Sequence, residues 1–253
     1  MKYDVVNRRI WFKGEILNVN DAKVNVLAPT SQFGLNVFEG IPCYWNDDEK
    51  QLYAFRLDEH YERLIRSAKL IQFDLKYTKE DFKKALIDVV KANEYDENLS
   101  PRIKCGANYI NSRVGQREAL RNGYDTCIFL NEVGKVAEGP GSCFFMVKGN
   151  TVITPRLTDT VLESNTRDTI IKLATEELRL KFEERTIDRT EVYMADEAFL
   201  CGSAMEVTPI FTVDRYQIGT GEQGEVTKKI HMKYLECVQG RLESRKNWIT
   251  PVY

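Results

Sequence analysis

Histidine is scarce in this sequence, and its cysteines show no paired spacing. His60 and His231 are the only histidines, which argues against a histidine-rich metal site, so we expect no bound metal. No Gly-x-Ser-x-Gly motif precedes a helix, as a serine hydrolase of that type would require. No Cys-x-x-Cys pair occurs, and we expect most cysteines to be reduced core residues. They are Cys43, Cys105, Cys127, Cys143, Cys201 and Cys237.

A strong excess of charge and long apolar runs are also absent. The chain has 36 basic and 38 acidic residues, so no basic excess points to nucleic acid. No apolar stretch approaches the ~20 residues of a membrane-spanning helix. The first residues, Met1 to Val5, lack the apolar core of a signal peptide. We therefore expect a cytoplasmic protein with neither a nucleic-acid nor a membrane partner.

The length of 253 residues allows two modest domains. Residues 93–100 are polar and irregular, and the pattern after them becomes mixed α/β. We predict a small N-terminal α/β domain over 1–100 and a larger C-terminal α/β domain over 101–253, an α/β (α+β) fold class.

Hydrophobic periodicity predicts the individual elements. Helices are expected at 56–71, 78–93, 107–121, 166–180 and 226–243. Hairpins are expected at 5–19 and 41–55, and further strands at 22–27, 126–130, 143–147, 151–153, 182–186, 197–200 and 206–213.

Lys104 stands in an unusual setting, Ile103-Lys104-Cys105-Gly106-Ala107. Small residues let a ligand approach the backbone closely. A lysine with a desolvated amine is a candidate Schiff-base nucleophile. Taken alone, the segment is more typical of an ordinary surface lysine.

Glu138 precedes the turn Gly139-Pro140-Gly141 at the end of a predicted strand. A buried carboxylate beside a heterocyclic nitrogen would keep that nitrogen protonated. Taken alone, a solvated glutamate in a turn is the commoner interpretation.

Three further segments are candidate anion sites. A predicted helix begins near Asn165 and Thr166, with Asn165 as its cap, and a helix N-terminus suits a phosphate. The turn Gly202-Ser203-Ala204 would offer backbone amides and a hydroxyl. Arg63 lies beside the apolar stripe of its helix, so its guanidinium could reach a phosphate from a buried stem. A plain cap, a connecting loop and a surface ion pair remain the respective alternatives.

Together these segments supply one amine, one carboxylate and three groups of anion donors, which are the parts needed to bind pyridoxal 5′-phosphate (PLP). In this order they also resemble the class IV (fold type IV) PLP-dependent aminotransferases, most of all the branched-chain amino acid aminotransferases. The matching segments are Phe38 to Ile41, Phe55 to Leu57 with Arg63, Lys104 to Tyr109, Gly123 to Asp125, Glu138-Gly139, Asn165 to Asp168, and Gly202 to Ile210.

The resemblance implies a role for each residue at the cofactor. Lys104 would be the Schiff-base lysine and proton shuttle, Tyr109 would hydrogen-bond the phenolic oxygen, and Glu138 would hold the pyridine nitrogen protonated. The phosphate would be bound by Arg63, Asn165, Thr166 and Ser203.

The resemblance also implies the substrate and the assembly. Phe38 would line the side-chain pocket, and the turn at Ser203 and Ala204 would bind the substrate carboxylate. The amino group of a branched-chain or similar hydrophobic L-amino acid would pass to 2-oxoglutarate by a ping-pong mechanism. The protein would be a homodimer or a higher homo-oligomer.

The sequence departs from the family pattern in one region. Relatives carry several tens of residues, with a Tyr-x-Arg-Pro motif, between the second N-domain helix and the lysine segment, whereas here residues 93–100 lead almost directly to Lys104. Pro42 replaces an arginine, and Phe33 replaces an aromatic hydroxyl. Three alternatives therefore stay open: D-amino acid transamination, a lyase resembling aminodeoxychorismate lyase, and a PLP-binding protein with impaired catalysis.

Overall fold

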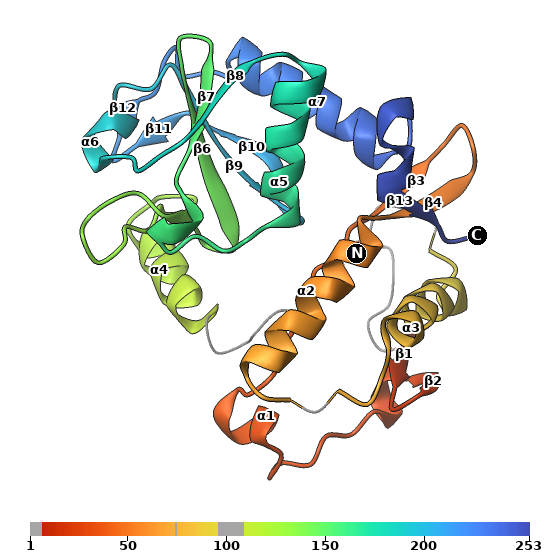
Figure 1. Ribbon diagram of the computed structural model, residues 1–253. Coiled ribbons are helices and arrows are strands. Elements are labelled where there is room, and N and C mark those ends of the chain that lie inside the picture. The colour runs from red at the N-terminus through yellow and green to blue at the C-terminus, as the bar shows by residue number, and fades with distance from the viewer. Residues whose placement is uncertain (1–6, 74, 96–108) are drawn as a thin grey trace. The chain divides into compact units, whose positions relative to one another are not determined.

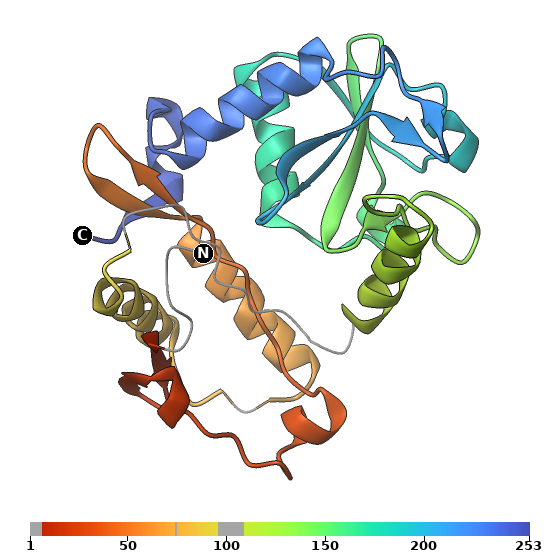
Figure 2. The same ribbon diagram turned by 180° about the vertical axis from the view of Figure 1, so that it is seen from behind.

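The computed structural model describes residues 7–73, 75–95 and 109–253, which fall into two compact units (Figures 1 and 2). The first unit comprises residues 1–107 and 238–253, and the second comprises residues 108–237. The C-terminal segment thus belongs with the N-terminal part of the chain, which the sequence pattern had not indicated.

The first unit combines two small sheets with two long helices. A hairpin joins β1 (Arg9–Phe12) to β2 (Glu15–Asn18), and β13 (Ile249–Pro251), β4 (Gln51–Phe55) and β3 (Cys43–Asn46) form an antiparallel sheet in that order. The helices are α1 (Pro29–Phe33), α2 (Leu57–Leu70) and α3 (Lys79–Ala92). All three tryptophans of the sequence, Trp11, Trp45 and Trp248, lie in this unit.

A capping box accounts for the start of α3, and the apolar face of α2 accounts for the core beside it. Thr78 accepts a hydrogen bond from the Asp81 amide, and Asp81 accepts one from the Thr78 amide, the reciprocal pair of a capping box. The apolar face of α2 places Leu57, Tyr61 and Leu64 in the core of the unit.

The second unit is built on a larger sheet. Among the described residues, the strand order is β10 (Glu206–Ile210), β9 (Glu197–Gly202), β6 (Ser142–Lys148), β7 (Thr151–Thr154) and β8 (Lys181–Glu184), with β5 (Glu138–Gly139) also paired to β6. The β7–β8 pair is parallel and the others are antiparallel. Residues 142–147 of β6 are all buried, as expected for a strand that is covered on both faces.

Helices flank this sheet in Figure 1, where α5 (Asn165–Lys172) packs against β9. The unit also contains α4 (Tyr109–Arg121), α6 (Arg189–Val192), α7 (Glu225–Val238) and the short strand pair β11 (Thr212–Val213) and β12 (Tyr216–Gln217). Both units therefore mix helix and sheet, which confirms the predicted α/β (α+β) class.

Several predicted boundaries were wrong. Residues 22–27 form no strand: Val24, Val26 and Leu27 are 58%, 75% and 70% exposed, so no packing surface holds them extended. Residues 126–130 form only an isolated bridge between Leu130 and Val136. The helix predicted over 166–180 becomes π-helical from residue 173 and ends at 177, and the last long helix ends at Val238 rather than near 243.

In the part of the chain that the structure describes, no helix is both long and apolar enough to cross a membrane.

Candidate active site

The turn at residues 139–142, between β5 and β6, is the centre of the site in the second unit. Gly141 adopts a positive φ of 74°, and a Cβ atom there would lie 3.4 Å from the ring of Tyr109. A Cβ atom at Gly202 would lie 3.2 Å from the Gly141 carbonyl oxygen. The turn therefore lies beside both the start of α4 and the end of β9. Glycine permits the close backbone approach at Gly202 and the positive φ at Gly141.

Glu138 is fixed at the edge of the same turn. Its side chain is half-buried, and its Oε2 accepts a hydrogen bond of 2.9 Å from the Leu162 amide. Its backbone is paired with Cys143 across β5 and β6. The carboxylate is thus oriented by the loop that leads into α5, and it joins that loop to the turn.

The N-terminus of α5 follows directly on this loop. Ser164, in an extended conformation, accepts a hydrogen bond of 3.3 Å from the Arg167 amide and is the cap. The prediction of Asn165 as the cap was therefore wrong by one residue, since Asn165 is already helical. Thr166 is buried in the first turn. A helix N-terminus with these neighbours favours an anionic group.

Ser203 and Ala204 lie in the turn between β9 and β10, where Gly202 pairs with Glu206. Ser203 is half-buried and Ala204 is exposed. Since Gly202 also touches the 139–142 turn, the second unit brings four predicted segments together: those at Tyr109, Glu138, Asn165 and Ser203.

Two cysteines that are distant in sequence lie beside each other next to this turn. Cys143 and Cys201 are directly opposite each other in β6 and β9, and both are buried free thiols. A hydrogen bond with Cys201 lowers the pKa of the Cys143 thiol, whereas burial raises that of Cys201. Positions 58 residues apart follow no local pattern, so only the strand pairing reveals them.

Arg63 belongs to a buried cluster in the first unit that we call the Glu39–His60–Arg63 triad. Arg63 donates from Nε to Glu39 Oε1 at 2.6 Å and from Nη2 to Glu39 Oε2 at 2.5 Å. His60 Nδ1 donates to Glu39 Oε2 at 2.7 Å. The three residues are 2%, 1% and 7% exposed, respectively.

Glu39 is charged in spite of its burial. Desolvation alone would raise the pKa of its carboxyl group, but the hydrogen bonds and charges of Arg63 and His60 outweigh it and lower the pKa. Glu39 and His60 were not among the site residues predicted from the sequence. A carboxylate inside the apolar run 37–41, and a histidine three residues before Arg63, were the available signals.

Phe38 and Lys104 are the remaining predicted site residues. Phe38 is half-buried next to Glu39 in the first unit. Lys104 lies outside the described residues.

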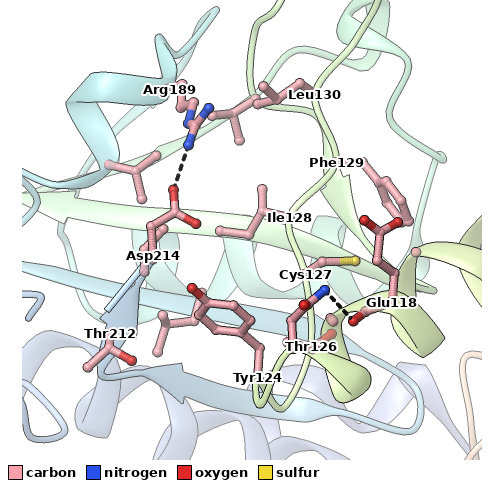
Figure 3. Close-up of a pocket in the computed structure, with 17 residues that line it drawn as sticks. Glu118, Tyr124, Thr126, Cys127, Ile128, Phe129, Leu130, Arg189, Thr212 and Asp214 are labelled. Atoms are coloured by element: carbon pink, nitrogen blue, oxygen red, sulfur yellow. Dashed lines mark hydrogen bonds and ion pairs between the residues drawn. The ribbon is translucent and has the colours of Figure 1, made fainter. Parts of the chain in front are cut away.

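A pocket of about 470 Å³ opens elsewhere in the second unit (Figure 3). It lies between α4, residues 124–130 and the strands β10 and β11, and Arg189 donates to Asp214 at its rim over 2.8 Å. Among the predicted cofactor residues that the structure describes, none lines it, so it is separate from the turn at residues 139–142. Within the described ranges, no group of three His, Cys, Asp or Glu side chains is arranged to hold a metal ion.

Comparison with known proteins gives closely related sequences. The sequence model of the family described as amino-transferase class IV matches residues 36–106 and 95–213. A probable branched-chain-amino-acid aminotransferase of Aquifex aeolicus (strain VF5) is 33% identical over 299 residues, covering 96% of each chain. This alignment has more positions than the present chain has residues, so the relative carries residues without a counterpart here.

The solved structures that are similar to this chain are of the same kind of protein as its sequence relatives. The branched-chain amino acid aminotransferase of Thermobaculum terrenum in its PLP form has a TM-score of 0.93 and 36% identity, covering 99% of this chain and 100% of that one. The branched-chain aminotransferase of Thermoproteus uzoniensis with norvaline has a TM-score of 0.92 and 34% identity, covering 97% and 99%. The order of the site segments, the fold and these similarities lead to one assignment. The chain belongs to the class IV aminotransferase family.

Proposed function

We propose that this protein is a PLP-dependent aminotransferase that moves the amino group of a branched-chain or similar hydrophobic L-amino acid to 2-oxoglutarate. Family membership and the names of its relatives support the activity and the cofactor. The observation that carries the proposal is the convergence of Tyr109, Glu138, the α5 N-terminus and the 203–204 turn around residues 139–142.

These residues fit the cofactor chemically. The positive φ of Gly141 and the tight contact that a Cβ atom would make at Gly202 both disfavour side chains at this turn, which would leave its backbone open to a flat ring. When bound, PLP supplies an electron sink for negative charge at the α-carbon of the amino acid. Glu138, oriented by the Leu162 amide, would keep the pyridine nitrogen protonated. Tyr109 would hydrogen-bond the phenolic oxygen.

The anion donors have separate tasks. The N-terminus of α5 at Asn165 and Thr166, together with Ser203 and Arg63, would bind the phosphate. The 203–204 turn would also offer amides to the substrate carboxylate, and Phe38 would line the side-chain pocket. Lys104 would hold the cofactor and then move the proton at the α-carbon, because a base that is already in place needs no diffusion.

The region around residues 95–106, which is shorter than in the relatives, concerns the expected rate of catalysis. The two family matches overlap at residues 95–106, so the residues that the relatives possess in addition fall near this point. Catalysis that is impaired relative to cofactor binding is therefore the second candidate. We also propose that the protein is cytoplasmic, as its composition suggests, and that it is a homodimer or a higher homo-oligomer, as the family resemblance implies. Light scattering of the purified protein measures its mass in solution, and a monomer would contradict the proposed assembly.

The first test is the visible absorbance spectrum of the protein with PLP, before and after L-isoleucine or L-leucine. We expect a bound-cofactor band that converts to that of the aminated cofactor and returns with 2-oxoglutarate. A bound-cofactor band that L-amino acids leave unchanged but D-amino acids convert would contradict the substrate assignment. A band that responds to none would support impaired catalysis.

Lys104→Ala is expected to abolish the bound-cofactor band, because the amine that holds PLP is lost. An unchanged spectrum in this variant would remove Lys104 from its role. Circular dichroism of the variant checks that it remains folded.

A further inference from the structure

We propose that Glu39 is a positioning residue that fixes the Arg63 guanidinium for the cofactor phosphate, with His60 holding Glu39 in place. The inference rests on the proposed function, because it assigns the phosphate of PLP to Arg63. It adds that the affinity for this phosphate depends on two residues that do not bind it themselves.

The contact between Glu39 and Arg63 determines the plane of the guanidinium. Both carboxylate oxygens are engaged, one by Nε and one by Nη2, at 2.6 and 2.5 Å. Such a side-on, bidentate pair is planar and directional. It turns the edge of the guanidinium that carries Nη1 away from Glu39. An arginine side chain held in this way has already lost the rotamer freedom that binding would otherwise cost.

The carboxylate is in turn held by α2. His60 and Arg63 are three residues apart and therefore lie on the same face of that helix. His60 Nδ1 donates to Oε2, the same oxygen that Nη2 contacts. Two donors from one rigid helix thus fix Glu39, and groups supported by regular elements keep their geometry best.

The orientation of the guanidinium, rather than net charge, determines how well the pair binds a phosphate. Glu39 neutralises Arg63, so the pair attracts a phosphate by the direction of its N–H groups rather than by net charge. Glu39→Gln makes the cluster more positive, which favours an anion, but it also releases the guanidinium. In a buried setting, an arginine without its carboxylate is left uncompensated and seeks new partners. We therefore expect the loss of orientation to prevail.

The test compares PLP with pyridoxal, which lacks the phosphate. The ratio of the dissociation constant of pyridoxal to that of PLP, here called the phosphate preference, isolates the phosphate contribution. Glu39→Gln should lower this preference about tenfold, the value of one hydrogen bond to a charged group, while pyridoxal affinity stays unchanged. His60→Leu should lower it less, since Arg63 still contacts both oxygens.

Glu62→Gln is the matched control. Glu62 precedes Arg63 on α2 and forms an exposed ion pair with Lys79 at 3.0 Å. This variant also removes one carboxylate charge from an ion pair of the helix, and it should keep the phosphate preference of the wild type.

A double-mutant cycle distinguishes positioning from a direct or general effect. Arg63→Gln should lower the phosphate preference, and adding Glu39→Gln to it should change nothing further. If Glu39→Gln has the same effect with and without Arg63, or if Glu39→Gln and His60→Leu both keep the full preference, the proposal is overturned. A folded wild-type protein that binds neither pyridoxal nor PLP would instead refute the proposed function.

Discussion

The ionisation of Glu39 links the stability of the first unit to pH. Its lowered pKa means that the folded state binds the proton less tightly than the unfolded state does. The stabilisation is therefore fully present above about pH 4.3, the ordinary pKa of glutamate, and is lost as pH falls through the folded-state pKa.

We expect Glu39→Gln to lower the free energy of unfolding of the first unit by about 3 kcal/mol near neutral pH, because it breaks a buried ion pair. This difference should narrow as pH falls below about 4.3. Urea titrations of both proteins at several pH values measure it. A difference that is constant with pH would mean that the charge of Glu39 contributes nothing.

The sequence predicted residue types better than it predicted their partners. Arg63, Glu138, Asn165 and Ser203 were selected from local surroundings, and the structure places each at a helix face, a strand end or a turn. Their roles at a cofactor stay predictions. The pairing of Glu39 with Arg63 was not predictable, because the two residues are 24 positions apart and no periodicity links them. Ser164 and Asn165 are both good capping residues, so sequence alone could not choose between them.

Among the elements, the C-terminal segment has the largest influence on the start of α2. The β13 strand pairs with β4, and the Trp248 carbonyl accepts a hydrogen bond of 2.6 Å from the Arg56 amide. Arg56, the residue before α2, has a positive φ of 49°, which is strained for a side chain of this size. The guanidinium carbons of Arg56 and Arg245 lie 5.0 and 4.7 Å, respectively, from the centre of the Trp248 ring.

Trp248→Ala is expected to destabilise the first unit by about 3 kcal/mol, since it removes a largely buried indole and two cation–π contacts. Trp248→Phe keeps an aromatic face for both arginines and should lose less than half of that. The midpoint of urea unfolding gives the comparison. Equal midpoints for the alanine variant and the wild type would show that this contact does not stabilise the unit.

Sequence patterns predicted an element well where the residues that determine it are close together in sequence. The helix expected over 78–93, which begins with a capping box, and the two hairpins of the first unit were confirmed, because their cap and turn residues are close together in sequence. The pairing of β13 with β4 was not predicted, since it joins segments nearly 200 residues apart. Long-range pairing depends on which surfaces remain uncovered, and no window of the sequence contains that information.

At the scale of the whole molecule, the chain has two compact units with separate cores. Two-state unfolding is common for single domains, and multi-domain chains often depart from it. We expect the two units to unfold at different urea concentrations, and Trp248→Ala to shift only the first unit. Coincident transitions that shift together would mean that the chain unfolds as one cooperative body.

The distribution of two residue types supplies the probes for that experiment. Because every tryptophan lies in the first unit, tryptophan fluorescence, excited at a wavelength that tyrosine does not absorb, reports on that unit. Cys143 in β6 and Cys201 in β9 are buried, so we expect them to react with a thiol reagent only when the second unit unfolds. Mass spectrometry identifies which cysteine has reacted. The protein is therefore naturally labelled, with an optical reporter in one half and a chemical reporter in the other, and needs no dye or fusion tag.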